Sequence, residues 1–569
     1  MPSLLVTLVL DASAATIHVP ADQPTVTSAV AAALDGDTVL IEPGDWSTEA
    51  QVHIQKSITL RGEQGADETT LPRLAIGGAA SVVLANALLA CPSATESSVV
   101  VSGSSLRATG IIGRACTGGT AFLVFAAPSF RVEDSVFEQW TSPAGPVVTS
   151  SGSDVALVRV SATNTSAVGG DPLWFDGAGH GGVIASTDDV AVHLESCTFA
   201  DTSAADRGGA VYVQGATGAV DLVGTTVDGA TATQGGAVYI GDSGLVSLNE
   251  FTVTDTITSG LTGAVVVRQS PLDVDHGRFV GNGPATSGAA LFASGGPIAV
   301  TRSLFCGNAG VVADLELLDA TAQLTASGFA HSLGTSMRAD YSDVTLTNAT
   351  FVDTTGGAVF LGGADLAIRN VAFANVTGNA LEGTDITPEP TGGYVAWDAV
   401  DALLLGDGWA PDALTPVLAN TPPGLQGDSS SCTPEALWLS LDSKLRDQGD
   451  PALLDVDGSR SDIGMFGGPD ADRADPDLDG DGFEGGVGPD CDDTDASVNP
   501  ATDDPTVNGV DEDCDGFDGL PVDSGEETAL EGVAQGGCSA CSTPAGPPAP
   551  AQVLFGLGLA SLLRRRARS

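Results

Sequence analysis

Aspartate residues suited to holding a metal ion are concentrated near the C-terminal end of the chain. Four of them alternate with other residues, and glycines lie between and after them: Asp475, Asp477, Asp479 and Asp481. Alternation within a tight loop lets several carboxylates converge on one point. Because Ca²⁺ takes six to eight oxygen ligands, this pattern predicts a calcium site.

The loop begins like an EF-hand but departs from that motif at the twelfth position. Gly486 or Gly488 stands there, depending on which aspartate opens the loop, where an EF-hand requires a bidentate Glu. Two further acidic clusters follow, each around one cysteine, Cys491 or Cys514. Their candidate ligands are Asp490, Asp492, Asp493 and Asp495 at the first cysteine, and Asp511, Asp513 and Asp515 at the second.

Residues 475–519 combine D-x-D-G-D-G-F, D-C-D-D-x-D-x-x-V-x-P and N-G-x-D-E-D-C-D-G. This pattern closely resembles the metal-binding motif of the MopE-type family, which was named for a copper-binding surface protein of methanotrophs. The resemblance implies a metal site and a disulfide between Cys491 and Cys514. Copper sites draw on His, Met or thiolate, and the segment contains no His or Met. Calcium is therefore the expected metal and copper the alternative, while an acidic linker is the other interpretation of the segment.

Acid–base chemistry has few candidates elsewhere. Asp176 with His180, and Asp188 and Asp189 with His193, come nearest to a constellation, and ordinary loop chemistry is the alternative for each. A hydrolase needs paired carboxylates at a groove, and a lyase needs a base near a cation-bound uronate. The repeat region has no Lys, and its arginines are scattered: Arg207, Arg268, Arg278, Arg302, Arg338 and Arg369. No catalytic residue is assigned.

The charge balance restricts the partners. The chain has 21 Lys and Arg against 73 Asp and Glu, a formal net charge of −52. Nucleic acid is excluded as an expected partner, because phosphate binding needs clustered basic residues. Direct binding of an acidic polysaccharide is disfavoured for the same reason, unless divalent cations bridge the two surfaces. Metal ions are the expected partners.

The central part of the chain is repetitive, and the repeat indicates which structure positions the candidate acid–base residues. Alternating strands such as 190–199, 219–227 and 245–253 recur with a G-G-A-V-Y-V type unit. The alanines of that unit, Ala210, Ala237, Ala264 and Ala289, are 27, 27 and 25 residues apart. A period of this length with short strands predicts one coil of a β-solenoid, with coils roughly 4.8 Å apart. A propeller blade would need a longer repeat, and a β-sandwich array is the other alternative.

These G-G-A and F-x-x-N units resemble the repeats of polymorphic outer-membrane proteins and of generic right-handed β-helix domains. The opening P-x-D-x-P-T-V and G-D-T-V-x-I-x-P-G-x-W of residues 20–46 also resemble the start of pectate-lyase-like β-helix proteins. The resemblance implies an all-β, right-handed parallel β-helix. Helical spacing of Val26, Ala29, Val30 and Ala33 after Pro24 predicts an amphipathic N-terminal helix that covers the first coil.

Residues 437–471, with their D-x-D-G-S-R-S-D-I-G-x-F-G-G-P core, resemble the closing segment of such proteins. Asp455, Asp457 and Asp462 in this segment are further cation candidates. The alternative is that these carboxylates accept hydrogen bonds from the backbone of turns at the end of the solenoid.

Both ends of the chain carry targeting features. The apolar run Leu4–Leu10 followed by Ala12-Ser13-Ala14 looks like a signal peptide, although no Lys or Arg precedes it, and an ordinary first strand is the alternative. At the other end, Cys538 and Cys541, an apolar stretch and Arg564, Arg565 and Arg566 resemble a myxobacterial-type sorting signal. The implied location is secreted or on the outer surface of a Gram-negative bacterium.

Nine cysteines are present. Cys91 and Cys116 are about one coil apart, a spacing that allows a disulfide between adjacent coils without assigning one. Cys197, Cys306 and Cys432 have no assignable partner, and burial as a free thiol is expected for each.

The expected organisation has six parts. They are 1–14 signal peptide, 15–390 β-helix, 391–469 irregular coils and closing segment, 470–519 Asp-rich metal-binding motif, 520–550 linker with the Cys motif, and 551–569 apolar and Arg-rich sorting tail.

The expected function is that of a non-catalytic surface or extracellular protein. It would act in adhesion, matrix contacts or a surface layer, bind divalent cations through the Asp-rich motif, and contact a polysaccharide or another cell-surface component. The alternative is a polysaccharide lyase or glycoside hydrolase of pectate-lyase-like fold.

Overall fold

The structure is a computed structural model. It describes residues 14–471 apart from 92, 94–95, 170–177, 261, 286–287, 385–386, 407–408, 411, 441 and 457, together with 491–492, 495, 497–499, 502 and 510–514.

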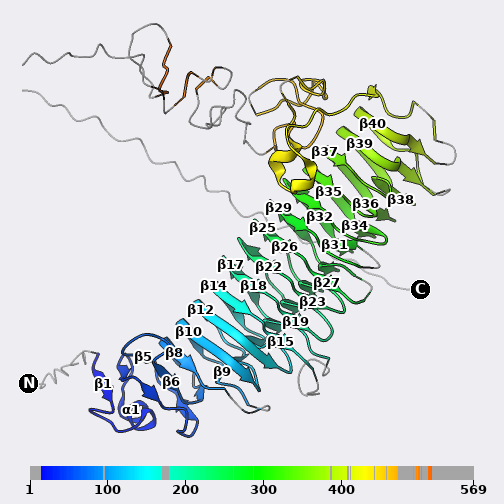
Figure 1. The fold of residues 1–569 in the computed structure, drawn as a ribbon. Helices are drawn as coiled ribbons and strands as arrows, with labels where there is room; N and C mark the ends of the chain where they lie inside the picture. Colours follow the sequence, from blue (N-terminus) through cyan, green and yellow to red (C-terminus); the bar gives the residue numbers. More distant parts are fainter. Residues whose placement is uncertain are drawn as a thin grey trace, which may run out of the picture.

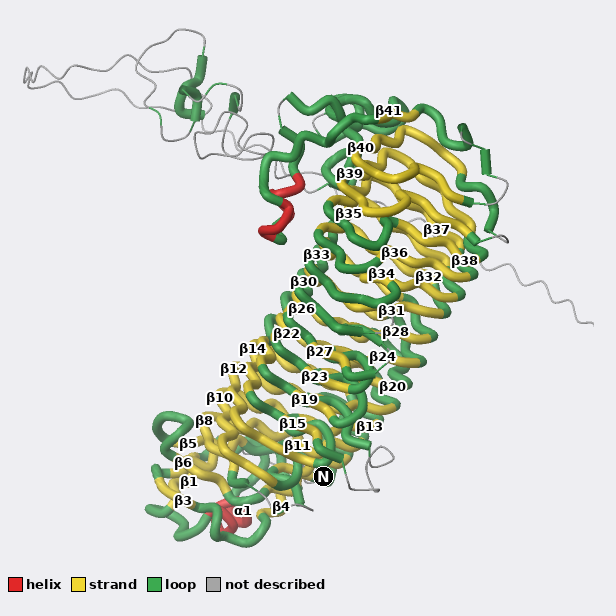
Figure 2. Tube along the Cα trace, turned by 45° about the vertical axis from the view of Figure 1, so that its right-hand side comes forward, coloured by secondary structure: helices red, strands yellow, loops and turns green. Residues whose placement is uncertain are grey.

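The chain winds into a right-handed parallel β-solenoid of about 16 turns (Figure 1). Every pairing between named strands is parallel and joins equivalent positions of successive coils. Figure 2 shows the strands aligned in columns along the length of the stack. The all-β solenoid predicted from the repeat is therefore confirmed. Most coils contribute a strand to each of three lateral faces, named A, B and C in the order in which the chain visits them.

The strands of face A lie at the start of each coil. They are β4 (Val52–Ile54), β7 (Leu74–Ile76), β9 (Val99–Ser102), β11 (Phe122–Phe125), β13 (Val148–Ser151), β16 (Ile184–Thr187), β20 (Val211–Gln214), β24 (Val238–Gly241), β28 (Val265–Arg268), β31 (Gly288–Ser294), β34 (Ala313–Leu318), β36 (Thr335–Asp340) and β38 (Val359–Gly362).

Face B follows, and several of its strands run on into face C. They are β1 (Thr16–Val19), β2 (Thr38–Ile41), β5 (Thr59–Gly62), β8 (Ser81–Leu89), β10 (Ser105–Thr117), β12 (Phe130–Ser142), β14 (Asp154–Thr163), β17 (Ala191–Glu195), β21 (Val220–Val223), β25 (Val246–Asn249), β29 (Leu272–Asp275), β32 (Pro297–Thr301), β35 (Thr321–Ala330), β37 (Asp343–Val352), β39 (Asp365–Gly383) and β40 (Thr391–Leu405).

Face C is completed by shorter strands. They are β3 (Gly44–Asp45), β6 (Thr69–Leu71), β18 (Thr198–Ala200), β22 (Thr226–Asp228), β26 (Thr252–Thr254), β30 (Arg278–Val280), β33 (Leu304–Cys306) and β41 (Val417–Ala419), with β15 (Ser166–Ala167), β19 (Ser203–Ala204), β23 (Thr231–Ala232) and β27 (Ile257–Thr258) at its far edge.

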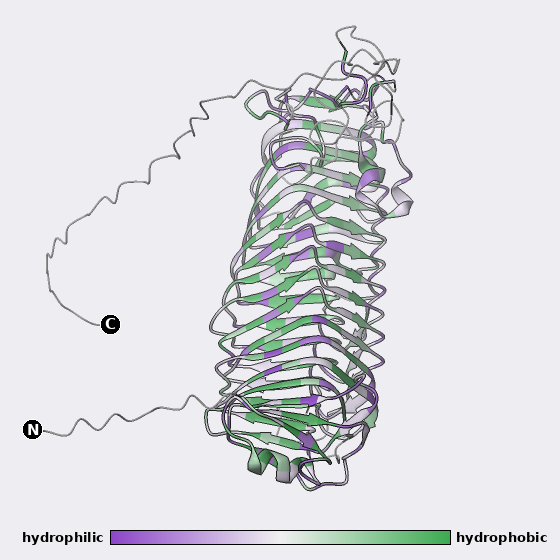
Figure 3. Cartoon of the chain, turned by 90° about the vertical axis from the view of Figure 1, so that its left-hand side faces the viewer, coloured by the Kyte–Doolittle hydropathy of each residue, from purple (hydrophilic) through white to green (hydrophobic). Residues whose placement is uncertain are grey.

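The core follows from the two-residue period of these strands. In β17 the inward residues Val192 and Leu194 are fully buried, while Ala191, His193 and Glu195 point outward. Figure 3 shows apolar strand residues along the whole stack. On face C, Phe279, Phe305, Phe329, Phe351 and Phe373 stack ring on ring through the core, with centroids 4.6 to 5.2 Å apart.

The glycine pairs of the repeat act at the turn into face A. Gly208 has a φ of +63°, and a Cβ on the next residue, Gly209, would lie 1.8 Å from the Gly236 carbonyl oxygen of the following coil. Only glycine permits this close approach, and Ala210 behind it is fully buried. The predicted role of this unit is confirmed.

Helix α1 (Val26–Ala32) lies beside the first strands, with Thr25 as its N-cap. Val26, Ala29 and Val30 are buried, and the helix packs on β1, β2 and β4 at one end of the stack (Figure 1). The helix itself is where the sequence predicts it. Its role in covering the first coil stays a prediction.

At the other end, β40 pairs in parallel with β39, and β41 pairs with β40, so solenoid pairing extends beyond residue 390. The chain then returns along the outside of the last coils. Residues 425–468, named the return segment, include the 3-10 helices η2 (Ser429–Ser431) and η3 (Pro434–Leu437). Leu437 and Met465 of this segment pack on Ala330 and Val352 of face C.

Three disulfides are present among the described residues. Cys91–Cys116 joins adjacent coils, the pairing that the spacing of these cysteines allows, and Cys491–Cys514 pairs as the motif resemblance implies. The expectation for Cys306 and Cys432 was wrong, because they form a disulfide that ties the return segment to the solenoid. The two cysteines are 126 residues apart, so the spacing between successive coils could not predict that they pair. Cys197 is a buried free thiol, as expected.

In the described part of the chain, no helix has the length and apolar character needed to cross a bilayer. The signal-peptide residues 1–13 and the tail residues Cys538, Cys541, Arg564, Arg565 and Arg566 lie outside the described residues.

Candidate functional site

Face B carries a column of charged side chains parallel to the solenoid axis. Because the coils are in register, Arg107, Arg131, Ala156, His193 and Asp221 occupy equivalent outward positions in five successive coils. Further along, the same column continues through Ser247 and Asp273. Successive members are roughly 4.8 Å apart, so the column offers repeated contacts to an extended ligand.

His193 lies between two carboxylates in the middle of this column. Its Nε2 is 3.5 Å from Glu195 Oε2 in the same strand, and its Nδ1 is 3.8 Å from Asp221 Oδ2 in the next coil. All three side chains are about one-third to one-half exposed. The imidazole ring is about 2 Å across, so the two carboxylates lie within about 10 Å of each other. In this group two carboxylates from neighbouring coils share one imidazole.

The neighbouring carboxylates of face B are held by arginines instead. Asp134 accepts hydrogen bonds from Arg159 Nε and Nη2 at 2.6 and 2.9 Å, and these hydrogen bonds hold the pKa of Asp134 below its ordinary value. Asp275 is bound by Arg302 in the same bidentate manner, at 2.8 and 2.6 Å. Burial would raise the pKa of Asp275, but the hydrogen bonds and charges of Arg302 and His276 together outweigh it and lower the pKa. These pairs frame the His193 group on both sides along the axis.

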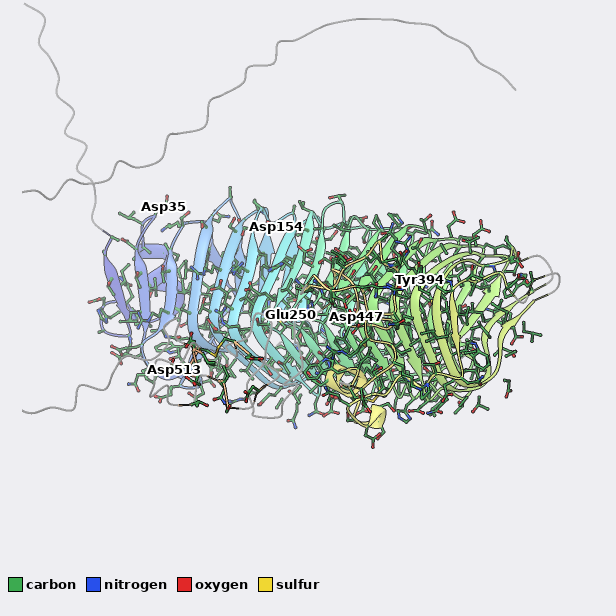
Figure 4. The ribbon with its side chains drawn as sticks, turned by 90° about the horizontal axis from the view of Figure 1, so that it is seen from above. Asp35, Asp154, Glu250, Tyr394, Asp447 and Asp513 are labelled. Atoms are coloured by element: carbon green, nitrogen blue, oxygen red, sulfur yellow. A yellow bond between two sulfur atoms is a disulfide. The ribbon has the colours of Figure 1, made fainter. Side chains whose placement is uncertain are left out.

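The corner between faces B and C adds polar side chains to the edge of this surface. Glu250 and His276 occupy left-handed corner positions with φ of 52° and 54°. Figure 4 labels Glu250 and also Asp154, which opens β14 at the opposite edge of face B. Glu250 and Asp154 therefore place one carboxylate at each long edge of face B.

The structure describes one of the two histidine groups considered from the sequence, that of His193 with Asp188 and Asp189. His193 is not paired with Asp188 or Asp189. Asp189 is buried inside the corner after face A, where it accepts hydrogen bonds from the Ser150 and Ser186 hydroxyls and from the Ser153 amide. Burial raises the pKa of Asp189 above its ordinary value. It organises that corner rather than reaching the surface.

His180 lies on a different surface, outside face A. Its Nδ1 is 3.5 Å from Asp206 Oδ2, and Asp176 lies outside the described residues. The imidazole stacks on Tyr212 at 4.3 Å, Tyr212 stacks on Tyr239 at 5.7 Å, and the Arg207 guanidinium lies over Tyr239 at 5.0 Å. The two tyrosines are only 5% and 7% exposed. This column therefore packs the outside of face A and offers no open ring face.

Ser429, His331 and Asp353 have the residue types of a nucleophilic triad without its geometry. Ser429 Oγ lies 2.9 Å from His331 Nε2 and donates a hydrogen bond to Asp353. Asp353 is near the same ring nitrogen, at 3.6 Å, whereas a triad aspartate orients the opposite one. This group fastens the return segment to the solenoid.

The carboxylates of the return segment bind backbone amides. Asp455 accepts hydrogen bonds from the amides of Asp462 and Gly468, and Asp462 accepts one from Asp447. Burial, with the nearby carboxylate of Asp455 adding to it, raises the pKa of Asp462 to about 7. These contacts match the alternative to a cation cage, and Asp457 lies outside the described residues.

The Asp-rich motif is described only in part. Asp492, Asp495, Asp511 and Asp513 are described, around the Cys491–Cys514 disulfide, and the hydrogen bonds from Ser497 lower the pKa of Asp495. The other candidate ligands, Asp475, Asp477, Asp479, Asp481, Asp490, Asp493 and Asp515, lie outside the described residues. Within the described ranges, no three His, Cys, Asp or Glu side chains are grouped as metal ligands. The calcium site stays a prediction.

No protein family and no curated protein matches this chain. Among solved structures, the chain is similar to a PL6 alginate lyase in complex with a trisaccharide, with 10% identity over 73% of this chain and 90% of that one and a TM-score of 0.32. It is also similar to a PL6 polysaccharide lyase from Pseudopedobacter saltans, with 11% identity, coverage of 63% and 84%, and a TM-score of 0.29.

A third similar structure is the catalytic unit of a GH87 α-1,3-glucanase from Streptomyces thermodiastaticus. The identity is 12%, the two chains are covered to 70% and 69%, and the TM-score is 0.28. These neighbours are polysaccharide lyases and glycoside hydrolases of β-helix fold, and at such identities the likeness concerns the fold alone.

Sequence reasoning singled out His193 but missed its partners Glu195 and Asp221. The signal was present in the repeat itself. Aligning the strand 190–199 with 219–227 on their leucines places His193 directly over Asp221, one coil apart. Searching for partners at the coil period, rather than nearby in sequence, finds this group.

Proposed function

We propose that this protein binds a polysaccharide along face B and hydrolyses its glycosidic bonds at His193, Glu195 and Asp221. The observation that carries the proposal is the imidazole held between two carboxylates on an outward, half-exposed strand surface. An extended polymer lying parallel to the axis would contact one coil after another, because equivalent side chains repeat along the column.

The proposed hydrolysis takes the inverting course, which the spacing of the two carboxylates permits. Inverting glycosidases separate their acid and base by about 6.5 to 9.5 Å, whereas retaining enzymes use about 5 to 5.5 Å. A separation of up to about 10 Å leaves room for a water molecule. One carboxylate would take a proton from that water, and the other, protonated, would give its proton to the leaving oxygen. His193 is the positioning residue between them.

A panel of polysaccharides tests the proposal. Purified protein is incubated with neutral and acidic polymers, and reducing ends are measured together with the ultraviolet absorbance of unsaturated products. Hydrolysis gives reducing ends without that absorbance, whereas absorbance would mean lyase chemistry instead. Glu195→Gln and Asp221→Asn should each lower the rate by about 10²-fold or more. Release of no product from any polymer that binds would contradict the catalytic part.

A second function is favoured by the Cys491–Cys514 disulfide, which constrains the Asp-rich motif. We propose that an exported form of the protein binds Ca²⁺ through this motif and acts at the cell surface, in adhesion or a surface layer. The carboxylates of the motif are oxygen ligands of the kind that Ca²⁺ prefers, and a disulfide leaves no thiolate for copper.

Calorimetric titration of the full chain with Ca²⁺ and Cu²⁺ tests this second proposal. Calcium binding that is lost when Asp475, Asp477, Asp479 and Asp481 are changed together to Asn would support it. Tight copper binding would overturn the choice of metal, and no binding of either ion would leave the segment an acidic linker.

A further inference from the structure

Two arginines on face B are organised by one buried carboxylate. Arg107 in β10 and Arg131 in β12 are paired in register, so their side chains rise from adjacent coils. Glu133 accepts hydrogen bonds from Arg107 Nε and Nη2 at 3.1 and 2.7 Å and one from Arg131 Nε. The carboxylate side chain is only 6% exposed, while the two guanidinium side chains are 61% and 40% exposed.

This arrangement differs from a surface salt bridge between single charges. Two guanidinium groups share one carboxylate, so the group carries an excess positive charge in a chain whose net charge is −52. Each guanidinium has five N–H donors, and Glu133 occupies two on Arg107 and one on Arg131. The other N–H donors of Arg107 and Arg131 belong to two exposed, planar guanidinium groups that Glu133 holds in place. Exposed guanidinium groups with free N–H donors are suited to binding an oxyanion.

The ionic state of Glu133 is consistent with this role. Burial alone would raise the pKa of Glu133, but the hydrogen bonds from Arg131 and Arg107 and the positive charges of these two residues together hold the pKa below its ordinary value. The carboxylate therefore stays charged and keeps both guanidinium groups in place. Glu133 is a positioning residue, and the arginines are the groups that would touch a ligand.

We infer that Arg107 and Arg131 form a subsite for an oxyanion, a carboxylate or a sulfate ester, carried by a sugar polymer on face B. Only Ala156 separates Arg131 from His193 in the same column, so the subsite is about 10 Å from the imidazole. A polymer lying along the axis can contact both. The inference rests on the proposed function for the kind of ligand, and it adds that the ligand is anionic despite the acidity of the chain.

Binding by three polymers with one backbone tests the inference. Dextran, carboxymethyl-dextran and dextran sulfate are titrated into the full chain by calorimetry at fixed ionic strength. We expect at least one anionic polymer to bind more tightly than dextran, and the two anionic polymers distinguish carboxylate from sulfate. The double variant Arg107→Gln/Arg131→Gln should weaken that binding by about tenfold or more. Arg114→Gln, which removes an exposed arginine from the same strand, should leave it unchanged.

Glu133→Gln separates an organised subsite from simple charge attraction. The substitution makes the surface more positive, so charge attraction alone predicts tighter binding of the anionic polymer. An organised subsite predicts weaker binding, because neutral Gln no longer holds both guanidinium groups, with binding partly restored in Glu133→Asp. Circular dichroism checks that each variant keeps its β structure.

Equal affinity for dextran and both anionic polymers, or binding that is unaffected by the double arginine variant, would overturn the inference. Because binding is measured without turnover, the subsite can be confirmed even if no polymer is cleaved. Conversely, cleavage by His193 and its partners with unchanged binding in the arginine variants would leave the proposed function standing without the subsite.

Discussion

The side chain of Asp314 is wholly buried inside the solenoid, where it accepts a hydrogen bond of 2.6 Å from the hydroxyl of Ser332 in the next coil. Its other carboxyl oxygen, Oδ1, has no hydrogen-bond partner. Burial raises the pKa of Asp314 to about 8, and the hydrogen bond from Ser332 only partly opposes this rise. The group is therefore a protonated carboxylic acid at neutral pH.

Asp314→Asn should change how stability depends on pH. The pKa of Asp314 is about 8 in the folded protein and ordinary, about 3.8, in the unfolded chain, so between these values only the folded state holds the proton. The free energy of unfolding then falls as pH rises, by at most about 1.4 kcal/mol per pH unit, and levels off above pH 8. Asn does not titrate, so thermal unfolding midpoints from pH 5 to 8.5 should fall less steeply in the variant.

Asp343→Asn is the matched control, because Asp343 is exposed on β37 near the same coils. It should leave the slope of the wild-type curve unchanged. If Asp314→Asn and wild type give parallel curves, Asp314 does not carry a buried proton.

The stacked phenylalanines predict a large local stability effect. Phe329 lies between Phe305 and Phe351 with ring centroids 4.8 and 4.7 Å away. Phe329→Ala would remove both contacts and open a cavity inside the coil, at a cost of about 3 to 5 kcal/mol. Denaturant unfolding measures the loss, and Leu333→Ala, an exposed residue four positions away, should cost far less. Similar losses in the two variants would contradict the role of the ring stack.

Much of the fold could be predicted from the sequence because each coil needs the same kinds of residue at its turns and at its inward-facing strand positions. The alanines that follow the glycine pairs must all fit one tight turn, so Ala210 and Ala237 recur at a constant interval that reveals the coil period. Every strand of the stack has one side that faces the core, so apolar and polar residues alternate along it. Val192 and Leu194 face inward in this way, and His193 between them faces outward. Local patterns of this kind can be read without coordinates.

What the sequence could not reveal depends on contacts that skip many coils or on the local environment of a charge. Cys432 reaches Cys306 only because the return segment folds back over face C. The coil period of the repeat does not predict where this segment packs. Glu133 and Glu195 are both outward glutamates on face B, yet arginines bind the first and an imidazole accompanies the second. That difference arises from residues in neighbouring coils.

Removing the Cys306–Cys432 disulfide should loosen the return segment. In Cys306→Ala/Cys432→Ala the segment would keep its apolar contacts with face C but lose its covalent tie, which should speed its proteolysis. Limited proteolysis with identification of cut sites within residues 425–468 measures the change. Cys91→Ala/Cys116→Ala removes a disulfide between adjacent coils far from the segment, so its cut sites there should match wild type. Equal cutting rates in both double variants would contradict the role of the tie.

The two aspartates of the face B column offer a direct test of the His193 group. Asp221 lies 3.8 Å from His193 Nδ1, whereas Asp273 occupies the same column two coils further on, beyond Ser247. If the group hydrolyses a polysaccharide, Asp221→Asn should lower kcat by about 10²-fold or more and remove one limb of the pH–rate profile, because a proton-transfer group is lost. Asp273→Asn removes the same charge from the same surface and should leave both kcat and the profile unchanged. Equal effects of the two substitutions would mean that the column acts only through its overall charge, and the catalytic assignment of Asp221 would then be wrong.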